Sequence, residues 1–530
     1  MTAEKPTPKV AVIGLGSCGL AALKNLREAG FDATGYESNP YVGGLWEHSE
    51  EPDKTSVLKT TVANLSKQMS CYTDYPYPDD VPNYATAAQT ARYLKDYAEH
   101  FGLLQHARLG MRLLNVERES ERWILRMVRV DDKEEERIEV DKLVFCVGLQ
   151  VQTPKLPKIK GIETFTGQAI HSNNYKNGFN FTGKRVVVVG LGNTGCDTAV
   201  DLIPHASSVW MSHRHGAAFF SRTNKKTGKP ADHMMSIRLT KLAGIFNKYL
   251  PNLAQRLSLL GIKAVQKRTF EIKPEWKLDE ILPPTRKVPI ANDNFIPALH
   301  EGKIGLKPAL KEVNGNTLTF SDDSTLSDID AIIFTTGHRS DYTYLPSTID
   351  PTRNPPAEWS SLPGSDSRPL PRLYQGIFSL DHPHSLAFLG TSPFSFQACL
   401  NYDISSLAVA QIWAGNSSLP SSTDMSAHVD AQHASILKIA RTGELANVNL
   451  RNNWEWFKWC DDVAGLGIVK RVGYGVEGWK FWLRDRALCK LVMDGLLSPH
   501  LMRLFEEGKR RSWEGARGEV FRVNEMARRG

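Results

Sequence analysis

Two stretches of this chain share one form, and together they constrain the fold more than any other feature. Residues 10–20 read VAVIGLGSCGL and residues 185–196 read RVVVVGLGNTGC, so two apolar strands each run into a GxGxxG turn. Glycines at this spacing allow a tight turn, close approach of the backbone to a pyrophosphate, and close packing of the following helix, whose N-terminus favours an anion. The pattern therefore predicts two dinucleotide-binding βαβ units. The glycines concerned are Gly14, Gly16, Gly19, Gly190, Gly192 and Gly195.

The residue at the end of the second strand distinguishes the two predicted sites. Glu37 stands 23 residues after Gly14, where a carboxylate accepts hydrogen bonds from a ribose diol and repels a 2′-phosphate. The corresponding position of the second unit is Ser212, which Arg214 and Arg222 follow. A guanidinium fork suits a phosphate dianion, and the offset of these arginines argues against their being ordinary surface charges. We therefore expect FAD in the first unit and NADPH in the second.

The order of the motifs predicts an α/β fold with two Rossmann-like domains, the second inserted in the first. We expect the first part of the FAD-binding domain in residues 1–160, and the NADPH-binding domain in 161–335. Residues 336–530 would return to the FAD domain and add a C-terminal helical region. Residues 232–290 are expected to form a helical insertion, because Leu and Ile alternate there with Lys and Arg at roughly helical spacing. Such an insertion either packs on the core or rests on a membrane or a partner.

Composition excludes several other classes of protein. The chain has 530 residues, is 41% hydrophobic and 23% charged, and carries a net charge of +7, which does not indicate nucleic acid as a partner. Its seven cysteines include no CxxC pair, and no set of side chains has a convincing metal-ligand spacing. The polar N-terminus and the absence of an 18-residue apolar run predict a cytoplasmic protein without a membrane span. Peripheral membrane contact and a homodimer stay open.

Further stretches resemble the flavin-containing monooxygenases over nearly the whole chain. They are ESNPYVGGLW (37–46), NLSKQMSCYTDYPYPDDVPNY (64–84), FTGQAIHSNNYKN (165–177) and IFTTGHRSDYTYL (333–345). The third fits the identifying pattern of that family, FxGxxxHxxx(Y/F), through Phe165, Gly167, His171 and Tyr175. The fourth is similar to the family's FATGY segment between the domains, but Thr335 and His338 replace Ala and Tyr.

The resemblance implies roles for individual residues. His171 is expected to position the segment between the domains, and Asn64 to lie beside the flavin ring and the nicotinamide as the catalytic side chain; as an alternative, its amide only caps a turn. His215 stands where relatives often have a second arginine, which predicts a preference for NADPH that is either pH-sensitive or milder. The implied FAD contacts are Gly14, Gly16, Ser17, Gly19, Glu37, Gly44, Leu45, Trp46 and Asn64. The implied NADPH contacts are Gly190, Gly192, Asn193, Thr194, Gly195, Ser212, Arg214 and Arg222.

The resemblance also implies a reaction. NADPH would reduce FAD, O₂ would form a C4a-hydroperoxyflavin, and its distal oxygen would pass to an amine nitrogen or a sulfur of a small organic substrate, as in N,N-dimethylaniline monooxygenases. A Baeyer–Villiger oxygenation of a ketone is the alternative, although that family's motif has Trp followed by Pro or Asp where Tyr175 and Lys176 stand here. A non-catalytic redox-sensing module is a further alternative of another class. Substrate contacts are expected from the insertion and from residues 390–405.

Overall fold

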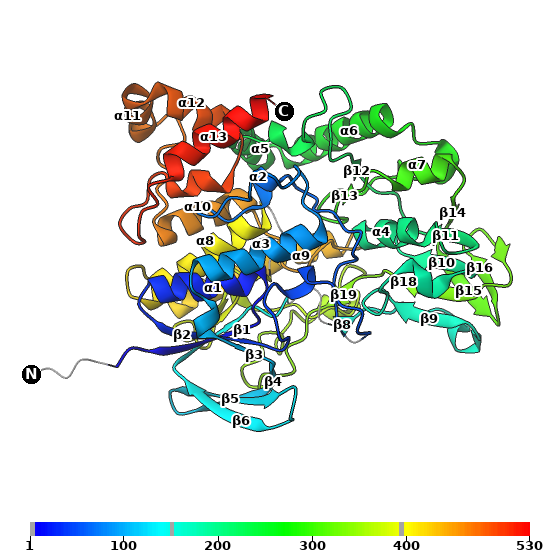
Figure 1. Ribbon diagram of the computed structural model, residues 1–530, viewed down its shortest axis with the longest axis horizontal. Helices are drawn as coiled ribbons and strands as arrows, with labels where there is room; N and C mark the ends of the chain where they lie inside the picture. Colours follow the sequence, from blue (N-terminus) through cyan, green and yellow to red (C-terminus); the bar gives the residue numbers. More distant parts are fainter. Residues whose placement is uncertain (1–5, 53, 149–152, 392–396, 530) are drawn as a thin grey trace, which may run out of the picture.

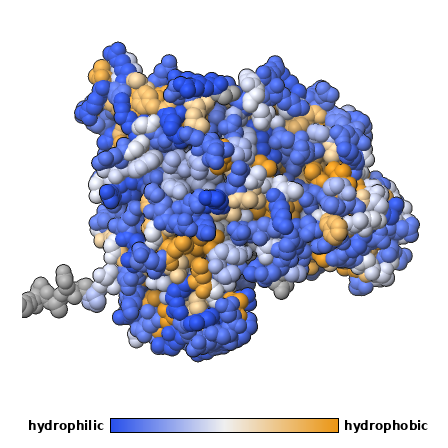
Figure 2. Space-filling view, viewed as in Figure 1, coloured by the Kyte–Doolittle hydropathy of each residue, from blue (hydrophilic) through white to orange (hydrophobic). Residues whose placement is uncertain are grey.

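The computed structural model describes residues 6–52, 54–148, 153–391 and 397–529. It contains two large sheets that lie side by side, with helices around them (Figure 1); the first is mixed, because β20, β21 and β22 pair in antiparallel fashion, and the second is parallel. The face drawn in Figure 2 is mostly hydrophilic, with separate apolar patches. The apolar runs of the sequence thus form buried strands, and the polar residues cover them.

The first sheet has seven strands in the order β20-β21-β22-β7-β1-β2-β3. Helix α1 (Ser17–Glu28) begins directly after the first glycine turn and packs against α8 (Ala398–Trp413). The chain therefore supplies this sheet first from its N-terminal part and again after residue 370. Its strands are β1 (Lys9–Ile13), β2 (Asp32–Glu37), β3 (Ala107–Leu109), β7 (Lys142–Phe145), β20 (Leu373–Tyr374), β21 (Phe378–Ser379) and β22 (Leu386–Phe388).

The second sheet is parallel throughout and has the order β14-β11-β10-β18-β9. Its central strand β10 (Arg185–Val189) runs through the second glycine turn into α4 (Asn193–Leu202). All five strands lie in the chain between β7 and β20, so the expected insertion of the second unit in the first is confirmed. The other four are β9 (Gln168–His171), β11 (Ser208–Ser212), β14 (Ile304–Lys307) and β18 (Ala331–Phe334).

Smaller elements surround the two sheets. Two antiparallel three-stranded sheets flank the units, and a two-stranded pair, β8 with β19, joins the segments that cross between them. The remaining strands are β4 (Met111–Glu119), β5 (Arg122–Arg129), β6 (Glu135–Val140), β8 (Thr153–Pro154), β12 (Phe219–Phe220), β13 (Ile290–Ala291), β15 (Leu310–Asn314), β16 (Thr317–Phe320), β17 (Thr325–Leu326) and β19 (His338–Arg339). Helices α2 (Lys67–Ser70), α3 (Ala87–His100) and α7 (Phe295–His300) complete the two units.

The expected helical insertion is present as α5 (Ile237–Tyr249) and α6 (Pro251–Phe270), which run along one edge of the molecule (Figure 1). Ser236 caps α5 by accepting a hydrogen bond from the amide of Leu239, and Pro251 opens α6 where no amide donor is needed. Few of their apolar side chains are buried. No helix of the described ranges is long and apolar enough to cross a membrane.

The C-terminal region consists of helices and is tied to the first unit by buried ion pairs. Lys24 of α1 contacts Asp74 at 2.5 Å, Arg510 contacts Asp403 of α8 at 3.0 Å, and Glu506 accepts from Arg510 at 2.7 Å. Arg503 joins this network through Asp74, so three cations and three carboxylates are balanced in the interior. The helices are α9 (Ser422–Ala440), α10 (Asn453–Ala464), α11 (Val476–Arg484), α12 (Arg486–Asp494) and α13 (Ala516–Arg529).

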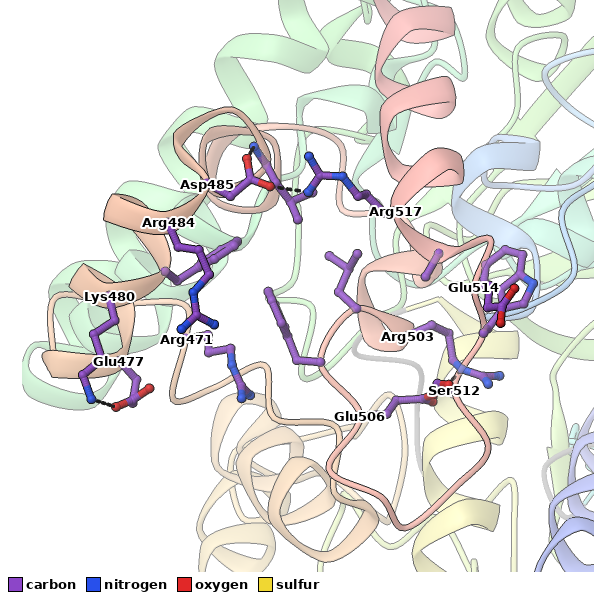
Figure 3. A pocket seen from close by; sticks show the side chains of 16 residues that line it. Arg471, Glu477, Lys480, Arg484, Asp485, Arg503, Glu506, Ser512, Glu514 and Arg517 are labelled. Carbon is purple, nitrogen blue, oxygen red and sulfur yellow. Dashed lines mark hydrogen bonds and ion pairs between the residues drawn. The ribbon is translucent and has the colours of Figure 1, made fainter.

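A cavity of about 620 Å³ lies among α11, α12 and α13. Figure 3 shows its charged side chains beside one another: Lys480 contacts Glu477, and Arg517 contacts Asp485. Because these charges pair with each other and neither glycine turn lines the cavity, we place the functional site elsewhere.

Candidate functional site

The first glycine turn is built from backbone in close contact. Gly14 has a φ of +89°, and a Cβ at this position would lie 2.8 Å from the carbonyl oxygen of Cys146. A Cβ on Gly19 would overlap the carbonyl of Gly14, and one on Gly16 would lie 3.5 Å from the Cα of Gly44. The turn thus admits only glycine at two positions, and it leaves the N-terminus of α1, which begins at Ser17, open to a pyrophosphate.

Glu37 ends β2 beside this turn and is 6% exposed. Its Oε2 accepts from the backbone amide of Leu15 at 2.8 Å, and its Oε1 accepts from the amide of Asn39 at 2.9 Å. These bonds hold the carboxylate still while leaving acceptor capacity for ribose hydroxyls. Leu45 and Trp46, both half-buried, follow in the short helical turn Gly44–Trp46, which lies against the first glycine turn.

The second glycine turn repeats this construction. Gly190 has a φ of +120°, and a Cβ there would lie 2.7 Å from the carbonyl oxygen of Thr335. The Thr335 hydroxyl, one of the two departures from the family segment, donates to the Gly190 carbonyl at 2.7 Å. A Cβ on Gly195 would overlap that carbonyl, whereas one on Gly192 would meet nothing within 4 Å. The space beside Gly192 at the start of α4 is therefore open, and Thr194 is exposed next to it.

The side chains expected to contact NADPH differ in whether they already make hydrogen bonds to other parts of the protein. Asn193 donates to the carbonyl of Pro289 at 3.2 Å and accepts from the amide of Ala291 at 2.9 Å. The Ser212 hydroxyl, 2% exposed, donates to the carbonyl of Pro308 at 2.8 Å. Through these hydrogen bonds Asn193 and Ser212 fix the backbone segments around the second turn. Arg214 has a side chain 60% exposed and contacts Glu444 at 2.6 Å, so it is accessible to an anion.

Four cations that sequence reasoning missed gather at the second turn. Lys155, Arg286, Lys287 and Arg368 come from three segments and line a cavity of about 360 Å³ together with Gly192. Burial, and then Arg368, lower the pKa of Lys155 to about 8; burial foremost also lowers the pKa of Lys287 to about 8 and that of Arg368 to about 10. Asp366 pairs with Lys155, and the positive charge that remains in excess fits a polyphosphate ligand. No spacing rule relates these three segments to the turn, so the sequence held no signal for them.

The two segments that cross between the units are joined at His171. Its Nε2 lies 3.0 Å from the carbonyl of Gly337, which can only accept, so Nε2 carries the proton and burial lowers the pKa of the ring. The His338 ring lies edge-on to it with centroids 4.8 Å apart. Tyr175 of the same motif donates to Asp201 at 2.7 Å. The motif therefore holds the crossing segments together.

Asn64 is exposed, and its Oδ1 accepts a hydrogen bond of 3.1 Å from Nη2 of Arg222. The structure thus brings Arg222 of the second unit to Asn64 of the first, and not to Ser212 and Arg214. Next to this contact, the amide of Ser66 donates to Asp232 at 2.6 Å. Residues 392–396 of the expected substrate segment lie outside the described residues. The described ranges contain no group of three or more side chains that could hold a metal ion.

Two glycine turns, an acid beside one and cations beside the other, define a protein that binds two dinucleotides. Comparison with known proteins narrows this class. The chain belongs to the flavin-binding monooxygenase-like family, whose model matches residues 7–529. The flavoprotein monooxygenase class expected from the sequence is thereby confirmed.

Named relatives match along almost the full chain. The chain is 43% identical to monooxygenase aurF of Gibberella zeae, covering 98% of both chains. It is 30% identical to the human putative dimethylaniline monooxygenase [N-oxide-forming] 6, covering 97% of this chain and 91% of the relative. These relatives support the family assignment over the whole length.

Solved structures show the same fold at lower identity. S-allyl-L-cysteine S-oxygenase from Allium sativum aligns with a TM-score of 0.61 and 18% identity over 99% of both chains. Cyclohexanone monooxygenase bound to ε-caprolactone aligns with a TM-score of 0.60 and 16% identity over 87% of this chain and 98% of the other. OTEMO in complex with FAD and NADP gives 0.60 and 17% over 87% and 98%. The expected fold is confirmed by these likenesses.

Proposed function

We propose that this protein is an NADPH- and O₂-dependent monooxygenase that oxygenates a soft nucleophilic nitrogen or sulfur of a small organic substrate. The observation that carries the proposal is the contrast between the turns, with a buried acid beside the first and an excess of cations beside the second. Bound FAD would accept the electrons of NADPH and activate O₂, which is the chemistry that the protein itself cannot supply.

We assign FAD to the first turn. The backbone of the turn and the start of α1 would bind its pyrophosphate, and Glu37 its ribose hydroxyls, because the carboxylate is already fixed by two backbone amides. The residues of this assignment are Gly14, Gly16, Ser17, Gly19, Glu37, Gly44, Leu45 and Trp46.

We assign NADPH to the second turn. OTEMO, a structural neighbour, binds FAD and NADP together, which supports one nucleotide at each turn. Arg214 and the cations Lys155, Lys287 and Arg368 would bind the phosphates, since each is a donor with positive charge. Gly190, Gly192, Thr194 and Gly195 would line the pyrophosphate, while Asn193 and Ser212 would hold the walls through their protein partners.

Asn64 is the side chain that we assign to the reaction. Its exposed amide would donate a hydrogen bond at the reacting oxygen and help to exclude water, which limits release of H₂O₂. No acid–base pair is required for this role.

The choice of substrate atom is part of the proposal. The human relative named as N-oxide-forming and the garlic S-oxygenase favour nitrogen or sulfur, as does Lys176 after the motif tyrosine. The fold is also that of a cyclohexanone monooxygenase, so oxygenation of a ketone is the second candidate. A non-catalytic redox module would bind both nucleotides without consuming NADPH.

Rapid mixing tests the proposal. The FAD-loaded protein, reduced by NADPH, is mixed with oxygenated buffer while flavin absorbance is followed. We expect a long-lived oxygen-dependent species whose decay is accelerated by amines or sulfides, with formation of the N- or S-oxide. Acceleration by ketones alone, with ester or lactone products, would favour the second candidate. Immediate return to oxidised flavin with stoichiometric H₂O₂, whether or not substrates are present, would contradict a monooxygenase.

We also propose a cytoplasmic protein whose insertion contacts an anionic membrane surface. Residues 233–270 contain no Asp or Glu. Leu242, Leu253, Leu257 and Leu260 are 53%, 46%, 51% and 62% exposed, and the same segment carries seven Lys and Arg residues, of which Arg238 and Lys248 pair with carboxylates outside it. Co-flotation with vesicles containing anionic lipid, lost in the Leu257→Glu variant and absent with zwitterionic vesicles, is the expected result. Failure to float with either kind of vesicle would contradict it. The cations are Arg238, Lys241, Lys248, Arg256, Lys263, Lys267 and Arg268.

A further inference from the structure

Arg222 lies at the contact between the two units and is almost fully engaged by protein atoms. Its side chain is 11% exposed. Nε donates to the carbonyl of Ala63 at 2.9 Å, and Nη2 donates to the carbonyl of Val62 at 3.0 Å and to Oδ1 of Asn64 at 3.1 Å. Three of its five N–H groups therefore bind three consecutive residues of the first unit.

Asp293 holds the other side of the guanidinium. Its Oδ2 accepts from Nη1 of Arg222 at 3.2 Å, and its Oδ1 accepts from the backbone amide of Arg222 at 3.1 Å and from the hydroxyl of Ser221 at 2.7 Å. The hydroxyl of Tyr84 donates to the Arg222 carbonyl. Only one N–H of the guanidinium is then without a partner in the described chain, so Arg222 cannot offer a two-donor fork to a phosphate unless these bonds break.

The chemistry of the contact fixes the orientation of the Asn64 amide. A guanidinium only donates hydrogen bonds, so the atom of Asn64 that faces it must be the carbonyl oxygen. The amide nitrogen is then the branch that does not face Arg222, and because Asn64 is an exposed residue its two hydrogens are available as donors. Without Arg222 the Asn64 amide could rotate by 180°. In that flipped orientation its carbonyl oxygen, which accepts hydrogen bonds, would replace the NH₂ group, which donates them.

We infer that Arg222 is a positioning residue that holds the Asn64 amide with its N–H donors toward the reaction space, supported by Asp293, and that it is not a ligand of the 2′-phosphate. This inference rests on the proposed function, because it assigns Arg222 a role through Asn64. It replaces the role that spacing alone suggests for Arg222, and it leaves Arg214 as the arginine available to the nucleotide.

The test compares three variants for FAD content, kcat/KM with NADPH and with NADH, and the H₂O₂ formed per NADPH consumed in the presence of a turned-over substrate. Asn64→Asp keeps an acceptor for Arg222 but has no N–H to donate. Arg222→Gln removes the charge and the fork, and Arg222→Lys keeps the charge with a single donor centre. Arg214→Met serves as the phosphate-site comparison, and Arg441→Gln, whose side chain is 55% exposed in a surface pair with Glu358, is the neutral control.

We expect Asn64→Asp and Arg222→Gln each to raise the H₂O₂ yield at least threefold, Arg222→Lys to raise it less, and all three to keep the ratio of kcat/KM for NADPH over NADH within twofold. Arg214→Met should instead lower the ratio of kcat/KM for NADPH over NADH and leave the H₂O₂ yield unchanged. In the double variant Asn64→Asp/Arg222→Gln the H₂O₂ yield should equal that of Asn64→Asp alone, because Arg222 acts through Asn64.

The failure of this inference differs from the failure of the proposed function. If Arg222→Gln lowers the NADPH preference tenfold or more while coupling is unchanged, Arg222 is a phosphate ligand and the inference is wrong. If Asn64→Asp uncouples but neither Arg222 variant does, the inference fails and the role of Asn64 stands. If Asn64→Asp itself stays coupled, the proposed role of Asn64 fails. If Arg222→Gln does not retain FAD, the same two quantities are measured in Arg222→Lys and Asp293→Asn: the preference for NADPH over NADH and the H₂O₂ formed per NADPH. Coupled turnover in both variants would overturn the inference.

Discussion

Glu444 contacts Arg214, the arginine that we assign to the phosphates of NADPH, and its removal should therefore strengthen NADPH binding. It contacts Arg214 at 2.6 Å, and its charge raises the pKa of Lys155, Lys287 and Arg368, counteracting their burial. A 2′-phosphate bound at Arg214 would compete with this carboxylate for the guanidinium, and the Glu444→Gln variant removes that competition.

The exposure of the pair sets the size of the effect. The side chains of Arg214 and Glu444 are 60% and 36% exposed, and pairs of this kind contribute up to about 1 kcal/mol. Glu444→Gln should therefore lower the KM for NADPH by up to about fivefold. Arg214→Met removes charge-assisted hydrogen bonds that contribute about 1.5–3 kcal/mol, so kcat/KM for NADPH should fall about 10- to 150-fold relative to NADH.

Anaerobic stopped-flow reduction of the flavin at pH 7, with NADPH and NADH in parallel, measures both effects. NADH lacks the 2′-phosphate and provides the internal control. In the double variant Glu444→Gln/Arg214→Met, the decrease in the KM for NADPH that Glu444→Gln produces alone should mostly disappear, because Glu444 competes mainly for Arg214. A Glu444→Gln variant that binds NADPH more weakly, or that changes both nucleotides equally, would refute the reasoning.

Three further predictions concern pH, stability and the second turn. Because burial lowers the pKa of Lys155 and Lys287 to about 8 and both lose charge above it, the KM for NADPH should rise between pH 8 and 10, with a shallower rise in Lys287→Met; a flat profile over this range in initial-rate kinetics would contradict this. Asp403→Asn leaves Arg510 without its carboxylate and should lower the free energy of unfolding by about 3–5 kcal/mol, against less than about 1 kcal/mol for the exposed Glu358→Gln. Since ion pairs depress the pKa of Asp403, its contribution should persist above pH 4 and disappear as the pH falls further, which acid titration of wild type and variant would measure. Gly195→Ala should retain FAD but lose NADPH binding by more than tenfold in equilibrium titration, because its Cβ would overlap the Gly190 carbonyl.

Features that depend on local pattern could be predicted from the sequence, and those that depend on distant segments could not. Each glycine turn is encoded in about ten residues, because strand, turn and helix follow one another in the chain. The position of Glu37 beside the first turn could be predicted because it lies at the end of the strand that pairs with β1, where spacing along the chain still determines position. Lys155, Lys287 and Arg368 come from a crossing segment, the end of the insertion and a loop beyond the second sheet, and only folding brings them together. The fold class was thus within reach of pattern, whereas much of the second site was not.

Arg214 and Arg222 mark where spacing stops being informative. β11 ends at Ser212, so Arg214 still lies at the carboxyl end of the sheet, beside the nucleotide turn. Before the chain reaches Arg222 it has passed through β12, which pairs with β13 of the insertion's far end and carries the arginine to the first unit. Because the chain leaves the second sheet before Arg222, this arginine reaches Asn64 and orients its amide. Asp232, which follows in the same unit, accepts a hydrogen bond from the nearby amide of Ser66. The second unit therefore completes the environment of Asn64, and the coupling of NADPH consumption to oxygenation should depend on this contact between the units as well as on the two glycine turns.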